Sequence, residues 1–426
     1  MNPRLAALAT EPGFRAARYA LALLLGAACG AVLAIHKQPE RPAASAPPST
    51  TVAVNGTDTV AQEVDALLYR TLREISDYRI DAALSEIDKV IISYPNFRLA
   101  HLIKGDLLLA RRQPITTLGN TNGAPRERIE ELRHEAQVRL ARYHNARPGD
   151  QVPRYLVQLN PQQRHAFVVD TSKSTLYVFE NHNVEPRYVA DYYTTIGKNG
   201  IEKNREGDQK TPLGVYHVTG SIPRQKLKDF YGAGAFPINY PNEWDRSQGR
   251  KGSGIWLHGT PSDTYSRPPR SSDGCVVLTN EDLKAISQNV QVGLTPVSIA
   301  DEIEWVAPDG ARAVRKELAQ QLENWRRDWE SLDTERYLKH YAENFTAGKL
   351  DLEQWSAHKR AVNSNKEWVK LSLDKVSIFL YPGRNDLAVV TFDQAYASSN
   401  LDSKMRKRLY WIKEGDAWHI IHEGAA

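Results

Sequence analysis

The sequence predicts a multidomain chain with an N-terminal membrane helix, a small α-helical domain, a mostly β domain and a C-terminal α+β cone domain. Three observations support this division. The chain has 426 residues, which is long for one domain. The period of its hydrophobic residues changes from helical spacing to alternation near Tyr155. It changes again after the Pro-Asp-Gly break at 308–310, so each part has its own pattern.

Residues 1–36 are predicted to be an export signal. Arg4, Arg15 and Arg18 precede the apolar run Tyr19–Ile35, which is just long enough to span a bilayer. The positive flank places the rest of the chain outside the cytoplasm. We therefore expect an anchor in the inner membrane and a periplasmic protein, with cleavage near residues 44–46 and release into the periplasm as the alternative.

Residues 37–59 are rich in Pro, Ala, Ser and Thr and are predicted to form a flexible linker. Residues 60–150 are predicted to form the helical domain, because their apolar side chains recur at helical spacing. The segment 78–105 resembles one tetratricopeptide hairpin, and a single unit makes no array. We expect a small packing domain or a homodimer contact. The helices are marked by Leu67, Leu68, Leu72 and Ile75, by Ala83, Leu84, Ile87, Val90 and Ile91, and by the segments 98–111 and 125–143.

Residues 151–303 are predicted to form a β sandwich or barrel. His165–Asp170 and Thr175–Glu180 alternate as strands do and are joined by a polar turn. Short strands with Gly- and Pro-containing loops follow, which is typical of all-β architectures. The further strand candidates are Val189–Thr195, Gly214–Thr219, Gly254–Leu257, Cys275–Leu278 and Pro296–Ile299.

Residues 311–426 are predicted to form the cone, in which helices precede an antiparallel sheet. Helices are expected over about 311–341 and 352–363. Strands are expected over Leu371–Tyr381, Leu387–Ser398 and Lys407–Lys413, with a last strand over Trp418–Glu423. Six tryptophans in this part are interpreted as core residues or, alternatively, as the lining of a pocket: Trp325, Trp329, Trp355, Trp368, Trp411 and Trp418.

Charge and cysteine content narrow the chemistry. A net charge of +4 over this length gives no basic stripe, so no nucleic-acid partner is expected, and the basic run 404–408 is interpreted as a solvated strand face. Cys29 lies in the apolar N-terminal run, which leaves Cys275 as the only thiol in the rest of the chain. A lone cysteine is often a small buried hydrophobe, so this residue needs further evidence before a function is assigned.

A histidine and this cysteine each stand beside a glycine at the end of a predicted strand. The stretches are 255–260, with His258-Gly259, and 271–278, with Gly274-Cys275. A thiol near its usual pKa of ~8.5 needs a base, and histidine can act as that base if a carbonyl near Gly259 orients its ring. A structural histidine beside a packed cysteine is the alternative interpretation. No short-spaced second ligand suggests a metal, and no cofactor is expected.

These residues resemble the YkuD-type L,D-transpeptidase family. The family pattern of His-Gly, a variable loop and Ser-x-Gly-Cys appears as His258-Gly259 and Ser272–Cys275. A second feature lies upstream, at Gly197-Lys198 and Lys210–Tyr216. Together the matches cover about residues 155–301 in the family's order.

The resemblance implies a sandwich-like catalytic domain that acts on peptidoglycan stem peptides. It implies that Cys275 attacks the carbonyl between meso-diaminopimelate and D-alanine of a tetrapeptide, and that D-alanine leaves and a thioester forms. His258 would be the base and Gly259 the backbone acceptor that orients it. The amides of Gly274 and Cys275 would stabilise the oxyanion, each donor contributing about 3 kcal/mol.

The sequence departs from the family pattern at two positions. Many members carry a basic residue where Asp273 stands and an arginine where Val277 stands. An acid beside the thiol disfavours the thiolate. Arg267 or Arg270 could replace the missing arginine, so Ser272, Asp273 and Arg270 complete the predicted substrate-binding set.

The C-terminal part resembles nuclear-transport-factor-like and SnoaL-like cones. A catalytic domain followed by such a cone resembles the cell-shape L,D-carboxypeptidases of helical bacteria. Three functions therefore stay open: an L,D-transpeptidase, placed first, an L,D-carboxypeptidase that trims tetrapeptides to tripeptides, and a catalytically silent peptidoglycan-binding scaffold. The cone is expected to assist substrate binding and to carry no catalytic residue.

Overall fold

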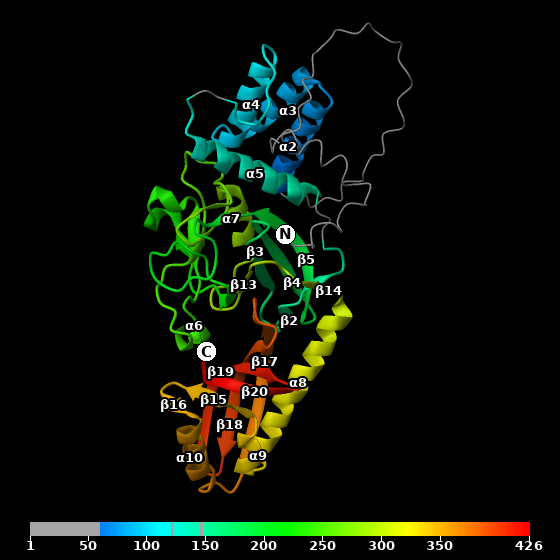
Figure 1. Cartoon of the computed structure of the whole chain (residues 1–426). Coiled ribbons are helices and arrows are strands. Elements are labelled where there is room, and N and C mark those ends of the chain that lie inside the picture. The colour runs from blue at the N-terminus through cyan, green and yellow to red at the C-terminus, as the bar shows by residue number, and fades with distance from the viewer. Residues whose placement is uncertain (1–59, 121–122, 145–147) are drawn as a thin grey trace, which may run out of the picture. The chain divides into compact units, whose positions relative to one another are not determined.

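The computed structural model describes residues 60–120, 123–144 and 148–426. They belong to two compact units, which divide between Tyr143 and His144 (Figure 1). The predicted anchor and linker, residues 1–59, lie outside the described residues. Within the described ranges, no helix has the length and apolar character that crossing a membrane requires.

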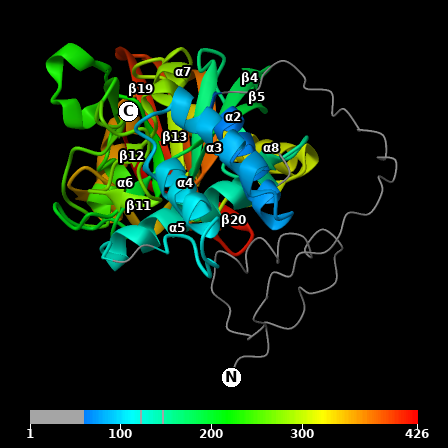
Figure 2. The same ribbon diagram turned by 90° about the horizontal axis from the view of Figure 1, so that it is seen from above.

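The first unit consists of helices, as predicted. Helices α2 (Val60–Ser76), α3 (Ile80–Ser93) and α4 (Arg98–Ala110) lie side by side, and α5 (Arg126–His144) follows (Figure 2). The side chains that marked α2 and α3 in the sequence are largely buried. Helix α5 is different, because its buried Arg139 forms ion pairs with Asp65 and Glu135 at 2.8 and 3.0 Å.

The second unit begins with a five-stranded sheet in the order β5-β4-β3-β13-β7. The hairpin of β3 (His165–Asp170) and β4 (Thr175–His182) is confirmed, with its turn at 171–174. Strand β13 (Pro296–Ala300) returns parallel to β3 and is buried along its whole length. The remaining strands are β5 (Glu185–Tyr193) and β7 (Gly214–His217).

A smaller four-stranded sheet, in the order β12-β10-β9-β8, holds the two sequence motifs. Strand β10 (Trp256–His258) is parallel to β12 (Val276–Val277). On its other side β10 is antiparallel to β9 (Gly234–Pro237). The predicted strands 254–257 and 275–278 are thus present but shorter. The other elements here are β8 (Ile222–Pro223), the pair β6 (Ile196–Gly197) and β11 (Arg270–Ser272), and helices α6 (Glu243–Ser247) and α7 (Asn280–Ser287).

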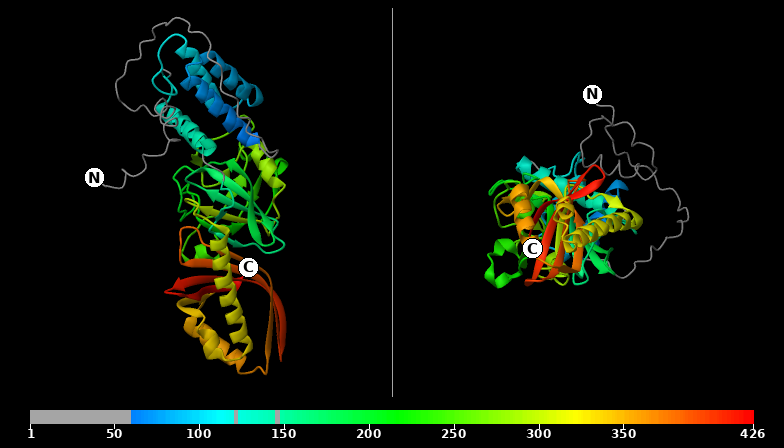
Figure 3. Two further views of the ribbon diagram at one scale, coloured as in Figure 1. Left: turned by 90° about the vertical axis from the view of Figure 1, so that its right-hand side faces the viewer. Right: turned by 90° about the horizontal axis from the view of Figure 1, so that it is seen from below.

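The cone has the predicted helices and long strands, and the sequence missed two strands that precede its last helix. The helical segments expected over 311–341 are present as two helices, because α8 (Pro308–Glu330) stops before Leu332, whose φ is 59°. A short helix, α9 (Thr334–Leu338), and a strand, β15 (Tyr341–Ala347), follow. Helix α8 runs along the cone's sheet (Figure 3). The other elements are β16 (Leu350–Asp351), α10 (Leu352–Asn363), β17 (Val369–Leu380), β18 (Leu387–Ser398), β19 (Leu401–Glu414) and β20 (Ala417–Ala425).

The cone's sheet includes a strand from the catalytic region. Strand β2 (Leu156–Gln158) pairs antiparallel with β17, and Leu156 lies opposite Phe379. A second connection is ionic, because Arg408 in β19 donates to both carboxylate oxygens of Glu243 in α6, at 2.9 and 2.7 Å. Strands β1 (Val152–Pro153) and β14 (Trp305–Val306) also pair. Residues 148–426 therefore belong to one compact unit.

Candidate active site

The parallel pairing of β10 and β12 brings the two motifs together. Leu257 lies opposite Val276, and His258 lies opposite Val277. This register places Cys275 beside Trp256, and because side chains alternate along strands, His258 projects from the same face of the sheet as both. Diagonal neighbours of this kind are separated by about 7–8 Å, a distance that leaves room for a reacting group between them.

His258 is oriented by the backbone. Its Nδ1 lies 2.7 Å from the carbonyl oxygen of Gly259, as the sequence led us to expect. A carbonyl only accepts hydrogen bonds, so Nδ1 carries the proton and Nε2 keeps a lone pair. The residue is 1% exposed, and this burial lowers the pKa of His258 to about 4, against the opposing effect of the Gly259 contact. The imidazole is therefore neutral at neutral pH and its Nε2 can accept a proton.

Cys275 is half-buried, and its Sγ donates to the carbonyl oxygen of Gly254 at 3.4 Å. Burial raises the pKa of the thiol to about 11. The backbone amide of Trp256 opposes this shift, and the charge of Asp273 adds to it. The resting site thus contains a neutral thiol beside a neutral imidazole, and His258 can act as the base only while the thiol attacks.

This charge state predicts an unusual pH dependence. Activity needs the unprotonated imidazole, so kcat/KM should stay constant down to about pH 5 and fall with a midpoint near the His258 pKa of about 4. Alkylation of Cys275 by iodoacetamide needs the thiolate, so its rate should keep rising above pH 9. Rate measurements from pH 3.5 to 10 test both, and an acid limb near pH 6.5 would contradict the assignment.

The turn before the thiol, residues 272–275, is called the nucleophile turn below. Gly274 has a φ of 120°, and a Cβ there would lie 2.6 Å from the Lys210 carbonyl oxygen, so only glycine fits. Its amide donates to Ser272 Oγ at 3.1 Å, and that hydroxyl donates to the Cys275 carbonyl at 2.6 Å. The Gly274 amide would have to exchange this bond to serve an oxyanion. The oxyanion roles of Gly274 and Cys275 remain predictions.

Asp273 and Arg270 are the two charged residues of the predicted substrate-binding set. Neither is a hydrogen-bond partner of the Cys275 thiol in the described part of the chain. Asp273 is exposed and accepts a hydrogen bond from Gln209 Nε2 at 3.0 Å. Arg270 is exposed on β11. Arg267 lies nearer, because its guanidinium carbon is 4.5 Å from the Phe230 ring, which is 5.9 Å from the His258 ring. Of the two arginines considered from sequence, Arg267 is therefore the one beside the candidate base.

Sequence reasoning missed an aromatic wall next to His258. Tyr231 lies 5.1 Å from the His258 ring and 4.9 Å from the Trp256 ring, measured between centroids. Phe230 is 43% exposed, which is high for such a side chain. Both residues come from a short 3-10 helix, η3 (Asp229–Tyr231), and Gly232 after it has a φ of 63°. The wall could hold the apolar part of a substrate against the catalytic pair.

No metal site accompanies this arrangement: among the residues that the structure describes, no cluster of three or more His, Cys, Asp or Glu side chains could hold an ion.

Comparisons with known proteins agree with this geometry. Residues 164–299 match the YkuD family of L,D-transpeptidase catalytic domains, and residues 317–424 match the Cds6 C-terminal NTF2-like domain. YafK of Escherichia coli, which bears an L,D-transpeptidase name, is 32% identical over 111 residues. That match covers 23% of this chain and only 40% of YafK.

Two solved structures are similar over both the catalytic domain and the cone. Bd1075 from Bdellovibrio bacteriovorus shares 32% identity at a TM-score of 0.58, over 65% of this chain and 98% of that one. The helical cell shape determining protein Pgp2 from Campylobacter jejuni shares 27% identity at a TM-score of 0.53. That alignment covers 63% of this chain and 95% of Pgp2.

Proposed function

We propose that this chain, which joins a YkuD-type L,D-transpeptidase catalytic domain to a Cds6-type NTF2-like domain, cleaves the meso-diaminopimelate–D-alanine bond of peptidoglycan tetrapeptides. The observation that carries the proposal is the parallel pair β10–β12. It places the only described thiol, Cys275, on the same face as an imidazole whose Nε2 is free to accept a proton. A nucleophile and an oriented base are what acyl transfer through a thioester requires.

The reaction follows from this arrangement. His258 Nε2 takes the thiol proton as Sγ bonds to the carbonyl carbon, and the oxygen gains negative charge. The C–N bond to D-alanine then breaks, and the imidazolium returns its proton to the departing amine. Neutral His258 is next able to take a proton from water as the water oxygen attacks the thioester. Sγ leaves with that proton, and a tripeptide remains.

Hydrolysis is favoured over transfer by the pairing of domains. The sequence alone placed transfer first. The chain, however, is similar to Pgp2 across catalytic domain and cone together, and that protein is a determinant of helical cell shape. Trimming tetrapeptides removes the donors from which cross-links are made, which is a direct route to an effect on shape. Transfer to an amine is the second candidate, and the L,D-transpeptidase family match over residues 164–299 supports it.

Purified tetrapeptide muropeptide distinguishes the candidates. Hydrolysis yields tripeptide and free D-alanine, whereas transfer yields a cross-linked dimer. A silent scaffold yields neither. The reaction should be run with the wild-type soluble chain and with Cys275→Ala, and products separated by chromatography and identified by mass. A dimer as the main product would overturn the hydrolase proposal and leave the acyl-enzyme chemistry standing.

The proposed substrate implies a location in the cell envelope. We propose that the predicted helix over 19–35 holds it at the inner membrane, facing the periplasm. Fractionation of cells expressing the full chain tests this location. Recovery of the protein from the cytoplasm would contradict it.

The cone's interior supports a role in holding peptidoglycan. Lys359 is buried, and its ammonium lies 4.4 Å from the Trp329 ring and 4.3 Å from the Trp355 ring. It makes no hydrogen bond or ion pair with another described residue, whereas its neighbour Lys407 pairs with Glu423 at 2.6 Å. Burial lowers the pKa of Lys359 to about 8, which leaves it largely charged at neutral pH. Two ammonium groups, Lys359 and Lys407, share the single Glu423 carboxylate, and an aromatic cage with this excess positive charge suits an anionic group of the wall.

Lys359→Met is therefore expected to weaken binding to intact sacculi about tenfold or more, because hydrogen bonds to charged groups contribute about 1.5–3 kcal/mol. Turnover of small soluble muropeptides should be retained. Deleting the cone is a poorer test, since it would remove the β17 partner of β2. Co-sedimentation with sacculi provides the measurement. The control is Lys370→Met, at an exposed lysine 5.9 Å from the Trp368 ring; equal binding by both variants would contradict the cage.

A further inference from the structure

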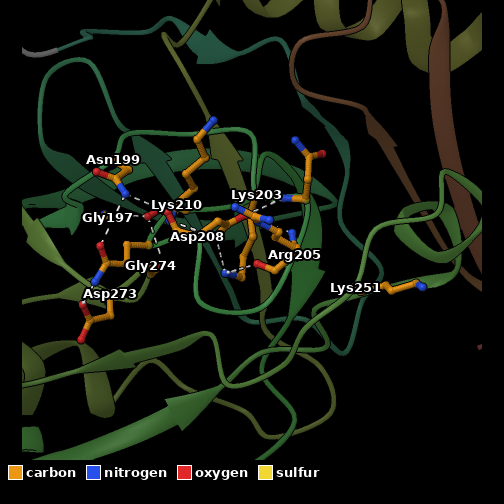
Figure 4. A network of polar contacts seen from close by, with 12 residues as sticks. Gly197, Asn199, Lys203, Arg205, Asp208, Lys210, Lys251, Asp273 and Gly274 are labelled. Carbon is orange, nitrogen blue, oxygen red and sulfur yellow. Dashed lines mark hydrogen bonds and ion pairs between the residues drawn. The ribbon is translucent and has the colours of Figure 1, made fainter.

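The nucleophile turn is held by one loop, residues 197–211. The Lys198 amide donates to the Ser272 carbonyl at 2.8 Å. Gln209 Nε2 donates to Asp273 Oδ1 at 3.0 Å, and Thr211 Oγ1 donates to the Gly274 carbonyl at 3.0 Å. Three consecutive residues before Cys275 are thus held by the same loop, and Figure 4 shows the polar contacts of this region.

The loop itself is organised around the carboxylate of Asp208, which lies among the labelled residues at the centre of Figure 4. Its Oδ1 accepts from the Lys203 ammonium at 2.7 Å and from the Lys210 amide at 3.2 Å. Its Oδ2 accepts from the amides of Asn204 and Arg205 at 2.8 and 3.0 Å. Four donors converge on one side chain, and a single residue separates Asp208 from Lys210, against whose backbone Gly274 packs.

The Asp208 carboxylate is ionised, and its hydrogen-bond donors stabilise the negative charge. Burial opposes ionisation of Asp208, but the hydrogen bonds from Arg205, Lys203, Asn204 and Lys210 outweigh it and hold the pKa of Asp208 well below its usual range. Lys203 is only 3% exposed, so it belongs to the interior of the loop. The Lys203 carbonyl in turn accepts from Tyr240 Oη at 3.3 Å, which ties the loop to the residues that precede α6.

The nucleophile turn packs closely on the loop, since a Cβ at Gly274 would lie 2.6 Å from the Lys210 carbonyl oxygen, and the loop is also closely packed within itself. A Cβ at Gly197 would lie 2.4 Å from the Gln209 carbonyl oxygen. Gln209 itself has a φ of 58°, in the left-handed region that non-glycine residues rarely adopt. Such conformations persist only where the surroundings impose them, and they concentrate at functional sites. A displacement of the loop would therefore be transmitted to the nucleophile turn.

The geometry points to Asp208 as a positioning residue for Cys275: its carboxylate fixes loop 197–211, and the loop fixes the nucleophile turn through residues 198, 209 and 211. The hydrogen bonds that Asp208 accepts all come from within loop 197–211, so it acts on the thiol through the loop. The assignment rests on the proposed function of Cys275 as the nucleophile. It also gives a physical role to the upstream sequence feature at 197–216.

Asp208→Asn tests the inference, because asparagine keeps the size of the side chain and removes its charge and one acceptor. We expect kcat on tetrapeptide to fall about 10- to 100-fold with KM little changed, as expected for a nucleophile displaced by about 1 Å. Alkylation of Cys275 by iodoacetamide at pH 8 should become faster. A loosened turn exposes the thiol, and each unit by which its pKa falls raises the thiolate fraction about tenfold.

The matched control is Asp170→Asn. Asp170 is, like Asp208, a carboxylate with several donors: Ser172 Oγ at 2.8 Å, the Lys173 amide at 2.9 Å and the Ile303 amide at 3.1 Å. It makes none of its contacts with loop 197–211. Both variants are compared by thermal melting and assayed well below their melting temperatures. The inference is overturned if Asp208→Asn matches Asp170→Asn in both kcat and alkylation rate.

Gln209→Asn is the milder second variant, for use if Asp208→Asn does not fold. Asparagine tolerates the left-handed backbone, and its shorter side chain does not reach Asp273. Its kcat and alkylation rate should change in the same directions by a smaller factor, and wild-type values for both would overturn the inference. The alkylation assay needs no peptide substrate. If the wild-type chain proves inactive on muropeptides, the proposed function fails. The alkylation rates of the variants still show whether Asp208 positions the thiol.

Discussion

Cys275→Ala is expected to abolish turnover of tetrapeptide stems and to leave the fold intact. The loss should exceed ~10³-fold, because no other thiol lies in the described part of the chain and the covalent step cannot occur without one. The fold should survive because the side chain is half-buried and the thiol is a weak donor in its 3.4 Å hydrogen bond to the Gly254 carbonyl. Product formation is measured by chromatography of muropeptides, and folding by circular dichroism.

Cys275→Ser serves as the near-isosteric companion. A serine hydroxyl fits the same space but is a much weaker acid and nucleophile, so this variant should also be inactive. It would bind substrate without forming the thioester. If either variant cleaved tetrapeptide at a rate near that of the wild type, the thiol mechanism would be wrong.

His258→Ala is expected to have the second largest effect, a loss of about 10²–10⁴-fold in kcat, which is the range that general base catalysis contributes. The structure gives the reason. Burial keeps the thiol protonated at neutral pH, so the attack depends on a base that removes the proton during the step. His258 Nε2 is the candidate base on the same face of the sheet.

His217 provides a matched control. Burial lowers its pKa to about 4 as well, and it lies on β7 rather than beside the thiol. His217→Ala should keep both the rate and the acid limb of the pH profile. If His217→Ala lost the acid limb while a slow His258→Ala kept it, the titrating group would be His217. That result would contradict the role of His258 as the base.

Much of the fold could be predicted from local patterns in the sequence. The strands of the β3–β4 hairpin and the cone's long strands follow from alternation, because apolar side chains recur at every second position, as at Ala388, Val390 and Phe392 of β18. The candidate pair came from two short motifs, His258-Gly259 and Gly274-Cys275, and from their resemblance to a known family. The parallel pairing of β10 and β12 brings the two motifs together, as that resemblance implied.

The parts that escaped prediction depend on distant contacts. Strand β2 is three residues long and is defined by its partner in the cone, so its own sequence carries no signal. Phe230 and Tyr231 became a wall of the site only through the fold of the segment around them. The charge state of the pair was equally hidden, because the pKa values of His258 and Cys275 are set by burial, which a motif does not encode.

Strand β2 belongs to the cone's sheet although it lies at the start of the catalytic region in sequence, and this affects how the chain folds during synthesis. The chain is made from its N-terminus, so β2 leaves the ribosome long before β17; Gln158 bonds to Val376, which lies 218 residues later. Until then the cone's sheet has no strand to receive β2, and the catalytic region cannot reach its final state alone. Contacts this far apart in sequence make folding slow and leave strand edges open meanwhile. A nascent chain of this protein therefore needs protection until its last hundred residues have emerged.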